Sequence, residues 1–363
     1  MPDRPENRKI DDDVRILNEK LQECELHLLV QVNERKQAEE SMLKNEQKIR
    51  ALFNETFQFV GLLTPDGVLV EVNRAALEFS GFEIDSVLNK PFWQGPWWAH
   101  SPELQEKLRQ SVEKVARGEF VRFEATHVAK DGSLHYIDFS LKPVWDGVGN
   151  VVYMIPEGRD VTEHKMAEEE RNKLLFWQQG INLLHQSLLM PAPLEDKLKL
   201  ITDSIVRLFD VDFARIWLIR PGDLCEKGCT HTKNTNGAHV CNYHEKCLHL
   251  LSSSGRYTSI DGKIHRRVPF GCYKIGLIAS GQEHKFVTND VSNDPQVHNH
   301  EWARELGLVS FAGYQLKVLK GDILGVLALF AKHAISESED ILLDALSNTT
   351  AFIVQQGMAQ RDL

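Results

Sequence analysis

The amino-acid sequence predicts an α+β protein in which two antiparallel-sheet domains are preceded and joined by long helices of the coiled-coil type. Apolar residues repeat three and four positions apart near the N-terminus and again after Thr162, which is the spacing of one helix face. Between these stretches the apolar period changes to two, as in half-buried strands. Helices interrupt the series of strands, an order that favours antiparallel sheets with grouped helices.

Composition is that of an ordinary globular protein. The 363 residues suffice for two or three folded units at about 150 residues each. The 52 acidic and 42 basic residues give a formal charge of −10, which argues against a nucleic-acid binder because such proteins normally carry a basic face. No apolar run reaches the roughly 18 residues that span a bilayer, and the N-terminus has no signal-peptide core. Six cysteines in so long a chain do not make a disulfide scaffold. We therefore expect a cytoplasmic protein without membrane insertion.

Signatures of common enzymes are missing from the sequence. It has no GxxxxGK[ST] phosphate loop, no GxGxxG after a strand, no GxSxG elbow and no HExxH. We therefore expect a protein that is not an enzyme, and no residue is assigned a catalytic role.

One long helix is predicted from about residue 10 to residue 52, because no Gly or Pro interrupts this stretch. Its apolar seam is too narrow to bury itself, so a parallel homodimer is the simplest solution, since identical chains present identical seams. The alternative is a helix that is solvated or packs within its own chain. The seam consists of Val14, Leu17, Leu21, Cys24, Leu28, Gln31, Arg35, Ala38, Met42, Asn45, Ile49 and Leu52.

The first domain is predicted to hold five strands and two grouped helices. The turn Thr64-Pro65-Asp66-Gly67 lies between two short apolar runs and predicts a hairpin. A short helix ended by Gly81 and a longer one ended by Gly118 come next. The predicted strands are 59–63, 68–72, 120–129, 134–144 and 151–157, and the predicted helices are 73–81 and 103–117.

These residues resemble a PAS domain, a small sensory module of signalling proteins. The matching stretches are LLTPDGVLVEVNRAALEFSGF, then GEFVRFEATHVAKDGSLHYIDFSLKPVWDGVGNVVYMIPEGRDVTEHK, which includes Asp160-Val161-Thr162. In the family the last motif joins the final strand to an outgoing signalling helix, so the resemblance implies the same role here. The expected organisation is an N-terminal helix at 1–45, a PAS domain at 46–165 with its C-terminal PAC part at about 118–170, and a helical linker at 166–192.

The second domain resembles a GAF domain, a larger sensory module, over residues 193–358. The matching stretches are KIGLIASGQ, VTNDVSNDP, LVSFAGYQLKV and ILGVLALFAKHAISESEDILLDAL. The resemblance implies a fold but no particular ligand. The predicted elements are helices at 198–208, 273–280, 301–305 and 336–356 and strands at 211–220, 247–253, 286–287, 312–318 and 325–331.

A cysteine-rich insertion at 223–249 carries the most distinctive chemistry. Cys225, Cys229, Cys241 and Cys247 fall within a short stretch that also holds several histidines. Four thiolates suit zinc or an iron–sulfur cluster, between which the spacing does not decide. Three alternatives stay open: redox-active thiols, haem on a single thiolate or imidazole, and cysteines that bind nothing. Cys272 is interpreted as a small buried hydrophobic residue.

The PAS-like segment also contains candidate pocket residues. Trp93, Trp97 and Trp98 lie close together, and Trp145 joins them in the same domain; they either line a cleft for a planar ligand or close the core, and we favour the core. Residues 46–165 contain no cysteine, so flavin–cysteine photochemistry is not expected. The histidines available to hold haem there are His100, His127 and His135.

Taken together, these patterns indicate a signal-transduction sensor. It would detect a small ligand or a redox state and relay it through coiled-coil helices to a histidine kinase, a response regulator or another signalling partner. Two other classes remain open. One is a truncated or degenerate sensor histidine kinase that lacks its transmitter, and the other is a dimerisation scaffold that senses nothing.

Overall fold

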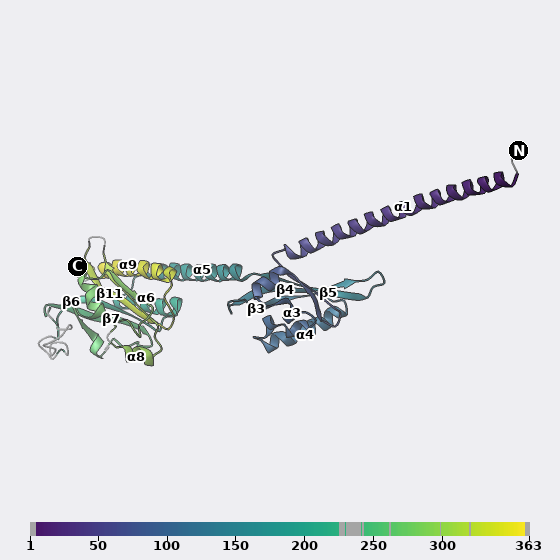
Figure 1. The fold of residues 1–363 in the computed structure, drawn as a ribbon. Helices are drawn as coiled ribbons and strands as arrows, with labels where there is room; N and C mark the ends of the chain where they lie inside the picture. The colour runs from purple at the N-terminus through teal and green to yellow at the C-terminus, as the bar shows by residue number, and fades with distance from the viewer. Residues whose placement is uncertain are drawn as a thin grey trace. The chain divides into compact units, whose positions relative to one another are not determined.

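The computed structural model describes residues 5–224, 229, 241, 243–260, 263–297, 299–318 and 321–359. The chain divides into two compact units, Met1–Glu168 and Glu169–Leu363. Each unit has its own antiparallel sheet and its own apolar core (Figure 1). The predicted α+β class with two antiparallel-sheet domains is confirmed.

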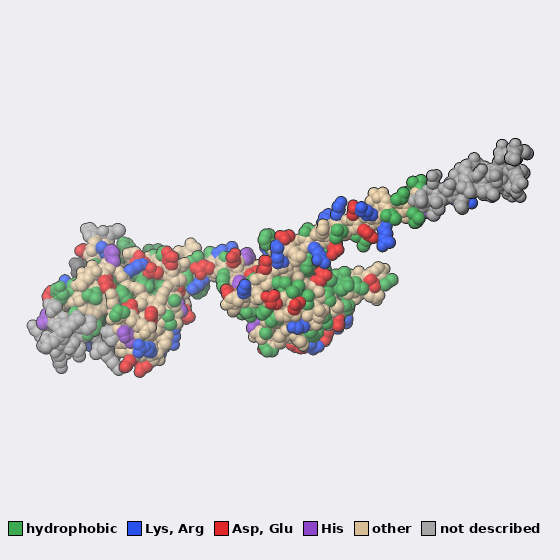
Figure 2. Space-filling view, in the orientation of Figure 1, with side chains coloured by type: hydrophobic (Ala, Val, Ile, Leu, Met, Phe, Trp, Pro, Cys, Tyr) green, Lys and Arg blue, Asp and Glu red, His purple; other side chains and the backbone are tan. Residues whose placement is uncertain are grey.

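Helix α1 (Pro5–Asn54) is one uninterrupted helix, as predicted. From residue 26 to residue 52 its side chains are solvent-exposed, and apolar ones lie among charged ones along it (Figure 2). Leu28, Ile49 and Leu52 of the predicted seam are 54%, 66% and 68% exposed. The side chains of Val14, Leu17, Leu21 and Cys24 lie outside the described residues, and the coiled coil itself stays a prediction. No described helix has the length and hydropathy needed to cross a membrane.

The first unit is built on a five-stranded sheet in the order β2-β1-β5-β4-β3. The predicted hairpin is present, and the last three predicted strands form a meander. All neighbouring pairs are antiparallel. The strands are β1 (Phe59–Leu63), β2 (Leu69–Val72), β3 (Val121–Val128), β4 (Leu134–Trp145) and β5 (Val151–Asp160).

Short helices connect β2 to β3 and cover one face of this sheet (Figure 1). Ser101 caps the longest of them by accepting the backbone N–H of Leu104 at 3.2 Å, and Pro102 occupies its first turn, where the missing N–H has no consequence. The sequence did not predict α3 or the two 3₁₀ helices. The helices are α2 (Arg74–Ser80), α3 (Ile84–Val87), η1 (Phe92–Gln94), η2 (Pro96–Trp98) and α4 (Pro102–Ala116).

Asn73 ties the end of α1 to the sheet. Its side chain is fully buried. The Nδ2 group donates to the carbonyl oxygens of Phe53 (3.1 Å) and Gln58 (2.7 Å). Oδ1 accepts the backbone N–H groups of Val60 (3.1 Å) and Ala76 (3.2 Å), the latter as the N-cap of α2. One amide therefore satisfies four backbone groups, which belong to α1, β1, α2 and the segment between α1 and β1.

Helix α5 (Thr162–Leu189) starts at the end of β5. The sequence interpretation assigned residues 166–192 to a linker, but Trp177, Leu184 and Leu188 are buried in the core of the second unit. Trp177 Nε1 donates to the carbonyl oxygen of Leu208 at 2.8 Å, and its ring stacks on Phe209. One helix thus begins in the first unit and contributes to the core of the second.

The second unit is built on a six-stranded antiparallel sheet in the order β8-β7-β6-β11-β10-β9. All described neighbours pair as antiparallel strands. Five of these strands were predicted, whereas the three-residue β8 was not. The strands are β6 (Phe213–Pro221), β7 (Lys246–Gly255), β8 (Arg267–Pro269), β9 (Lys285–Thr288), β10 (Ser310–Lys317) and β11 (Ile323–Ala331).

Two apolar cores lie on opposite faces of this sheet. The larger one is made with helices α5, α6 and α9, and the smaller one with α7 and α8. Successive side chains of a strand point to opposite faces of the sheet, so each strand contributes to both cores. This explains the continuous apolar runs of β10 and β11. The helices are α6 (Leu194–Phe209), η4 (Lys263–Arg266), α7 (Tyr273–Ser280), α8 (His300–Glu305) and α9 (Glu337–Ala359).

Replacing Asn73 by Ala is expected to lower the unfolding free energy of the first unit by about 2–4 kcal/mol, because four backbone groups lose their partner. The free energy of unfolding is measured in urea, with hydrogen exchange of the β1 amides as the read-out. Asn150→Ala is the matched control: Asn150 is an exposed turn residue, so we expect a change under about 0.5 kcal/mol. Equal effects of the two substitutions would contradict the structural role of Asn73.

Candidate functional site

A small cavity lies within the first unit, between the sheet and its covering helices. Its volume is about 40 Å³. That is room for about three water molecules and far less than the roughly 300–1,000 Å³ of pockets for drug-sized ligands. Apolar side chains dominate the wall. The lining residues are Phe59, Val60, Gly61, Leu69, Val72, Ala76, Ser80, Phe92, Trp97, Trp98, His127, Phe139, Pro156, Glu157 and Gly158.

His127 is the polar side chain at the centre of the aromatic residues on this wall. Its ring stacks on Phe59 with centroids 5.7 Å apart and meets Trp98 edge-on at 4.3 Å. Trp97 and Phe79 lie at 6.4 and 6.2 Å. Burial lowers the pKa of His127 to about 3, and the neighbouring His100 adds to this effect. The imidazole is therefore neutral at physiological pH.

Three buried nitrogen atoms in residues that line the cavity have no hydrogen-bond partner among the described residues. They are Nε1 of Trp97, Nε1 of Trp98 and Nδ1 of His127. The three side chains are 6%, 0% and 9% exposed, so bulk water does not satisfy them. Most buried polar groups in proteins are paired, so these atoms are exceptions, and they face packed side chains because the wall of the cavity itself is almost wholly apolar.

Trp93, His100, His135 and Trp145 do not line this cavity. His100 bonds Thr126 Oγ1 at 2.7 Å, and His135 bonds Asp160. Trp97 and Trp98 belong to the core and also line the cavity, whereas a planar ligand beside them stays a prediction. Trp145 is 51% exposed, so it neither belongs to the buried core nor lines the cavity. An alternating pattern through Ala125 and His127 in β3 could have indicated that His127 faces inward.

The junction between β5 and α5 is held by the Asp160-Val161-Thr162 motif. Asp160 Oδ1 accepts the backbone N–H of Thr162 at 2.9 Å, and Oδ2 accepts His135 Nδ1 at 2.8 Å. Thr162 Oγ1 in turn accepts the backbone N–H of Tyr136 at 2.8 Å. Burial raises the pKa of Asp160, but the hydrogen bonds from Thr162 and His135 outweigh it, so the pKa lies below its usual value.

The cysteines of the second unit are only partly described. Cys225 lies outside the described residues. Cys229 is half-buried, whereas Cys241 and Cys247 are buried. Burial raises the pKa of the Cys241 thiol, and negative charge at Cys229 raises it further. These two thiols are therefore electrostatic neighbours, although the structure does not test whether they bind a metal.

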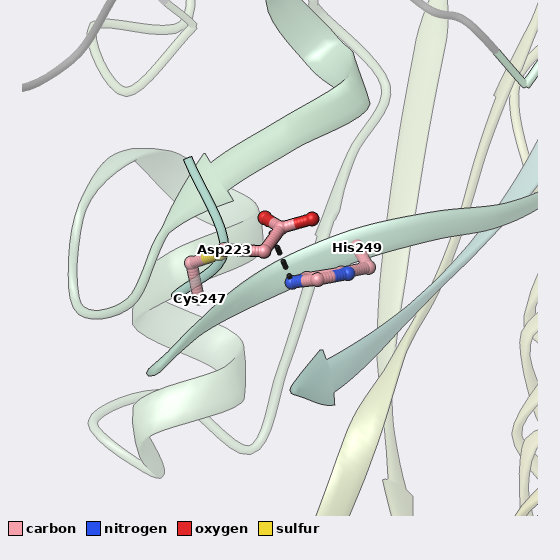
Figure 3. A group of neighbouring side chains, drawn as sticks. All are labelled: Asp223, Cys247 and His249. Carbon is pink, nitrogen blue, oxygen red and sulfur yellow. Dashed lines mark ion pairs between the residues drawn. The ribbon is translucent and has the colours of Figure 1, made fainter. Parts of the chain in front are cut away.

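One described group has the spacing of metal ligands: Asp223, Cys247 and His249, whose ligand atoms lie within 4.8 Å of one another (Figure 3). Asp223 follows β6, and the other two residues are two positions apart on β7. The hydrogen bonds that Asp223 and His249 already make compete with binding of a cation. Arg267 donates to both Asp223 oxygens, at 2.8 and 2.6 Å, and His249 Nε2 is 2.9 Å from the carbonyl oxygen of Pro221.

A carbonyl oxygen only accepts, so the proton of His249 must be on Nε2, which cannot then bind a metal. The hydrogen bonds from Arg267 hold the pKa of Asp223 well below its usual value. Asp223 and Arg267 therefore form an ion pair, and His249 Nε2 lies 3.6 Å from Asp223 Oδ1. Burial lowers the pKa of His249, and the charge of Arg267 adds to this effect, so the neutral ring is favoured. The sequence analysis missed Asp223 and Arg267 because they are 44 positions apart, with no local pattern to link them.

Cys272 is buried, as predicted, and lies near the cysteine-rich insertion. It is buried, and burial raises the pKa of its thiol, with an added contribution from charge at Cys241. Its backbone N–H bonds the carbonyl oxygen of Pro269, which is the pairing partner of Cys247 in β7. Tyr243, two residues after Cys241, packs edge-on against Phe270 at 5.3 Å. Cys272 thus lies near the cysteine-rich insertion. The sequence did not indicate this, because Cys272 follows the insertion by more than 20 residues.

Comparison with known proteins identifies both units. The family model described as PAS fold matches residues 53–165, and the GAF domain model matches residues 193–354. "Sensor histidine kinase TmoS" of Ectopseudomonas mendocina is 40% identical over 128 residues, which are 35% of this chain and 13% of that protein. "Hybrid signal transduction histidine kinase D" of Dictyostelium discoideum is 39% identical over 123 residues, 33% of this chain and 8% of that protein.

Solved structures are similar to each unit separately. The PAS domain of an HTR-like protein from Haloarcula marismortui aligns with a TM-score of 0.30 at 20% identity, covering 34% of this chain and 98% of that one. The GAF domain of a phosphoenolpyruvate-protein phosphotransferase from Coxiella burnetii aligns with a TM-score of 0.39 at 19% identity, covering 52% and 99%. Residues 53–165 thus match the family model of the PAS fold, and residues 193–354 match that of the GAF domain.

Proposed function

We propose that the chain is the input part of a signalling protein. A small ligand in the PAS cavity, or a redox change at the GAF thiols, alters the start of helix α5, and the helices pass this change to a partner. The partner class is a histidine kinase or response regulator, since the relatives that share about a third of this chain carry histidine-kinase names. The chain itself is proposed to have no catalytic role.

A continuous set of contacts from the cavity to α5 carries this proposal. Trp98 meets His127 at 4.3 Å, and Phe79 lies 6.2 Å from His127 and 5.0 Å, edge-on, from His135. His135 then holds Asp160, which accepts the first N–H of α5. His127 and His135 also face each other across β3 and β4. A shift of His127 therefore has a short packed route to the helix start.

Helix α5 supplies the second step of the relay. From Glu169 onward it belongs to the GAF unit, where Trp177 is buried and hydrogen-bonded. A rotation or shift of α5 that reaches the second unit would change the packing of Trp177 and its neighbours there. The rival view, a scaffold that only associates, predicts no response of α5 to changes in the cavity.

Hydrogen exchange at the first turns of α5 tests the route. His127→Phe keeps an aromatic ring but removes Nδ1, and we expect it to change exchange rates of amides 163–168 by about two- to fivefold. In a His135→Phe background, which breaks the bond to Asp160, the same substitution should leave these amides unchanged. The exposed Trp145→Phe serves as control. An effect of His127→Phe that persists undiminished without His135 would contradict the proposed route.

The exposed seam of α1 is proposed to pair with a second copy of the chain. The apolar residues Leu28, Met42, Ile49 and Leu52 repeat with coiled-coil spacing and lie more than half exposed. A second copy is the occupant because the same stripe is present on every chain. Charged residues flank the stripe, as in the i,i+4 pair of Glu46 and Arg50 at 3.1 Å.

Charge placed on the seam should dissociate the dimer. Leu28→Lys with Ile49→Lys is expected to halve the molecular mass in solution, because two buried Lys pairs would face each other across the interface. Val30→Lys with Leu43→Lys adds the same charge to α1 away from the seam and should leave the mass unchanged. Sedimentation equilibrium measures both. Equal masses for wild type and the seam variant would rule out dimerisation through this stripe.

The thiols of the GAF unit are proposed to bind zinc or an iron–sulfur cluster. The support is the sequence cluster of Cys225, Cys229, Cys241 and Cys247, together with the electrostatic proximity of Cys229, Cys241 and Cys272. Thiolate ligands bound to a metal would carry the negative charge that burial disfavours in free thiols. Redox-active thiols without metal are the second candidate.

Elemental analysis of the chain purified without oxygen tests the metal. We expect about one zinc ion, or several irons with sulfide, per chain. Cys241→Ser should abolish the metal content. Loss of metal in Cys272→Ser would show that Cys272 is also a ligand. Cys24→Ser, in α1, is the matched control and should retain full occupancy. Metal-free wild-type protein whose thiols all react with a thiol reagent would disprove the metal site.

A further inference from the structure

Helix α5 carries apolar side chains on two opposite sides. Trp177, Leu184 and Leu188 belong to the core of the second unit. On the other side, Phe176 and Leu183 are 54% and 63% exposed. A surface helix normally has one apolar side and one charged side, and a helix that is apolar on both is buried on both. We call the exposed side the outer face of α5; it consists of Asn172, Leu175, Phe176, Gln179, Asn182, Leu183, Gln186, Leu189 and Met190.

The outer face of α5 lies in a stretch of chain without charge. Residues 174–190 include no Asp, Glu, Lys or Arg, although these make up 26% of the sequence. Helix α6, which contributes to the same core, carries six such residues among its 16. Depletion of charged residues is typical of the centre of a protein–protein interface. The outer face of α5 therefore has the composition of an interface and not that of a solvated surface.

The residues of the outer face repeat every seven positions. Each repeat begins with an amide, at Asn172, Gln179 and Gln186. Two further residues follow three and four positions after each amide, and five of these six are apolar. In a coiled coil these are positions a, d and e, which lie on the side that meets the partner helix. The outer face thus combines an exposed, uncharged surface with the spacing of a helix-pairing seam.

We propose that the outer face of α5 packs against the outer face of α5 in a second copy of the chain, as a parallel seam. In a parallel pair each position faces its equivalent, so Gln179 of one copy meets Gln179 of the other. An amide has both a donor and an acceptor, so two identical amides satisfy each other. Identical charged side chains would repel, and the outer face contains none. The face is therefore complementary to itself, and this contact is additional to the proposed pairing of α1.

Helix α9 extends the uncharged surface beside α5. The two helices run in the same direction, since Ser338 bonds Glu170 at 3.4 Å and Thr349 bonds His185 at 3.3 Å. Residues 345–359 again include no Asp, Glu, Lys or Arg. A partner helix with charged residues would lose water here without gaining an ion pair, so an uncharged second copy fits better. The exposed side chains of this stretch are Ala345, Asn348, Phe352, Gln355, Gln356, Met358 and Ala359.

Two neighbouring glutamines provide a matched pair for disulfide cross-linking. Gln178 and Gln179 are both exposed, but only Gln179 belongs to the outer face, and Gln178 points about 100° away from it. The full chain is oxidised with copper phenanthroline in air, and dimers are measured on a non-reducing gel. Gln179→Cys should give at least about fivefold more disulfide-linked dimer than Gln178→Cys, because only residue 179 meets its own copy. Mass spectrometry identifies the linked peptide, and the wild type gives the background from the native cysteines.

Gln186→Cys tests the direction of the seam. In a parallel pair, residue 186 also meets its own copy, so it should cross-link as well as residue 179. In an antiparallel pair centred on residue 179, the two copies of residue 186 would be about 21 Å apart, at 1.5 Å for each of about 14 residues. A disulfide cannot span that distance. Cross-linking at residue 179 without cross-linking at residue 186 would overturn the parallel seam.

Charge placed on the outer face gives a second test. Leu183→Glu combined with Gln179→Cys should lower the yield of linked dimer at least about fivefold, because two carboxylates would face each other across the seam. Gln178→Glu combined with Gln179→Cys is the control and should leave the yield unchanged. Both added charges replace exposed side chains, so the fold of each chain is expected to persist.

The remaining outcomes identify other occupants of the outer face. Equal yields at residues 178 and 179, with fast alkylation of both by a maleimide, would leave the face open to a different protein. Slow alkylation at residue 179 without a disulfide-linked dimer would show that a segment of the same chain covers it. Either result overturns the second copy as the partner. Neither result bears on the α1 seam, which sedimentation of the Leu28→Lys with Ile49→Lys variant tests separately.

Discussion

The hydrogen bonds that join the last PAS strand to helix α5 are the constraint on which the account depends. Asp160 accepts the backbone N–H of Thr162 and the ring N–H of His135, while Thr162 accepts the backbone N–H of Tyr136. These bonds fix where the helix begins relative to β4 and β5, because a carboxylate with two donors has little freedom to move. Without them a change inside the PAS unit would have no defined effect on the helix.

Buried polar groups of the PAS unit are fully hydrogen-bonded at one place and unpaired at another. Asn73 is fully buried with all its hydrogen-bonding capacity used, so it rigidifies the entry from α1. Trp97, Trp98 and His127 are also buried, but each leaves one nitrogen atom without a partner among the described residues. Buried polar groups are normally paired, so the first arrangement is the common one. The same unit therefore contains a fully hydrogen-bonded joint and a buried aromatic cluster with unpaired nitrogen atoms.

The sequence predicts the fold well where local chemistry decides it and the site poorly where distant residues meet. The turn at Pro65–Gly67 predicts the hairpin, and Asn73 and Gly81 bound α2 as an N-cap and a left-handed C-cap would. By contrast, the pairing of Asp223 with Arg267 and the approach of Cys272 to Cys241 join segments far apart in the chain. β8 is too short to show a period of two. The aromatic cluster was identified, but its division between core and cavity depends on packing.

The most direct test of the central claim is a double-mutant cycle between the cavity and the helix junction. Trp98→Phe replaces the indole ring that lines the cavity, and Asp160→Asn weakens the hydrogen bond to the backbone N–H of Thr162. The free energy of opening of the first turn of α5, from hydrogen exchange, is measured for the wild type, both single variants and the double variant. Coupling through His127 and His135 predicts an interaction energy of at least about 0.5 kcal/mol. Additivity within about 0.3 kcal/mol would show that the two sites are independent, which would contradict the account.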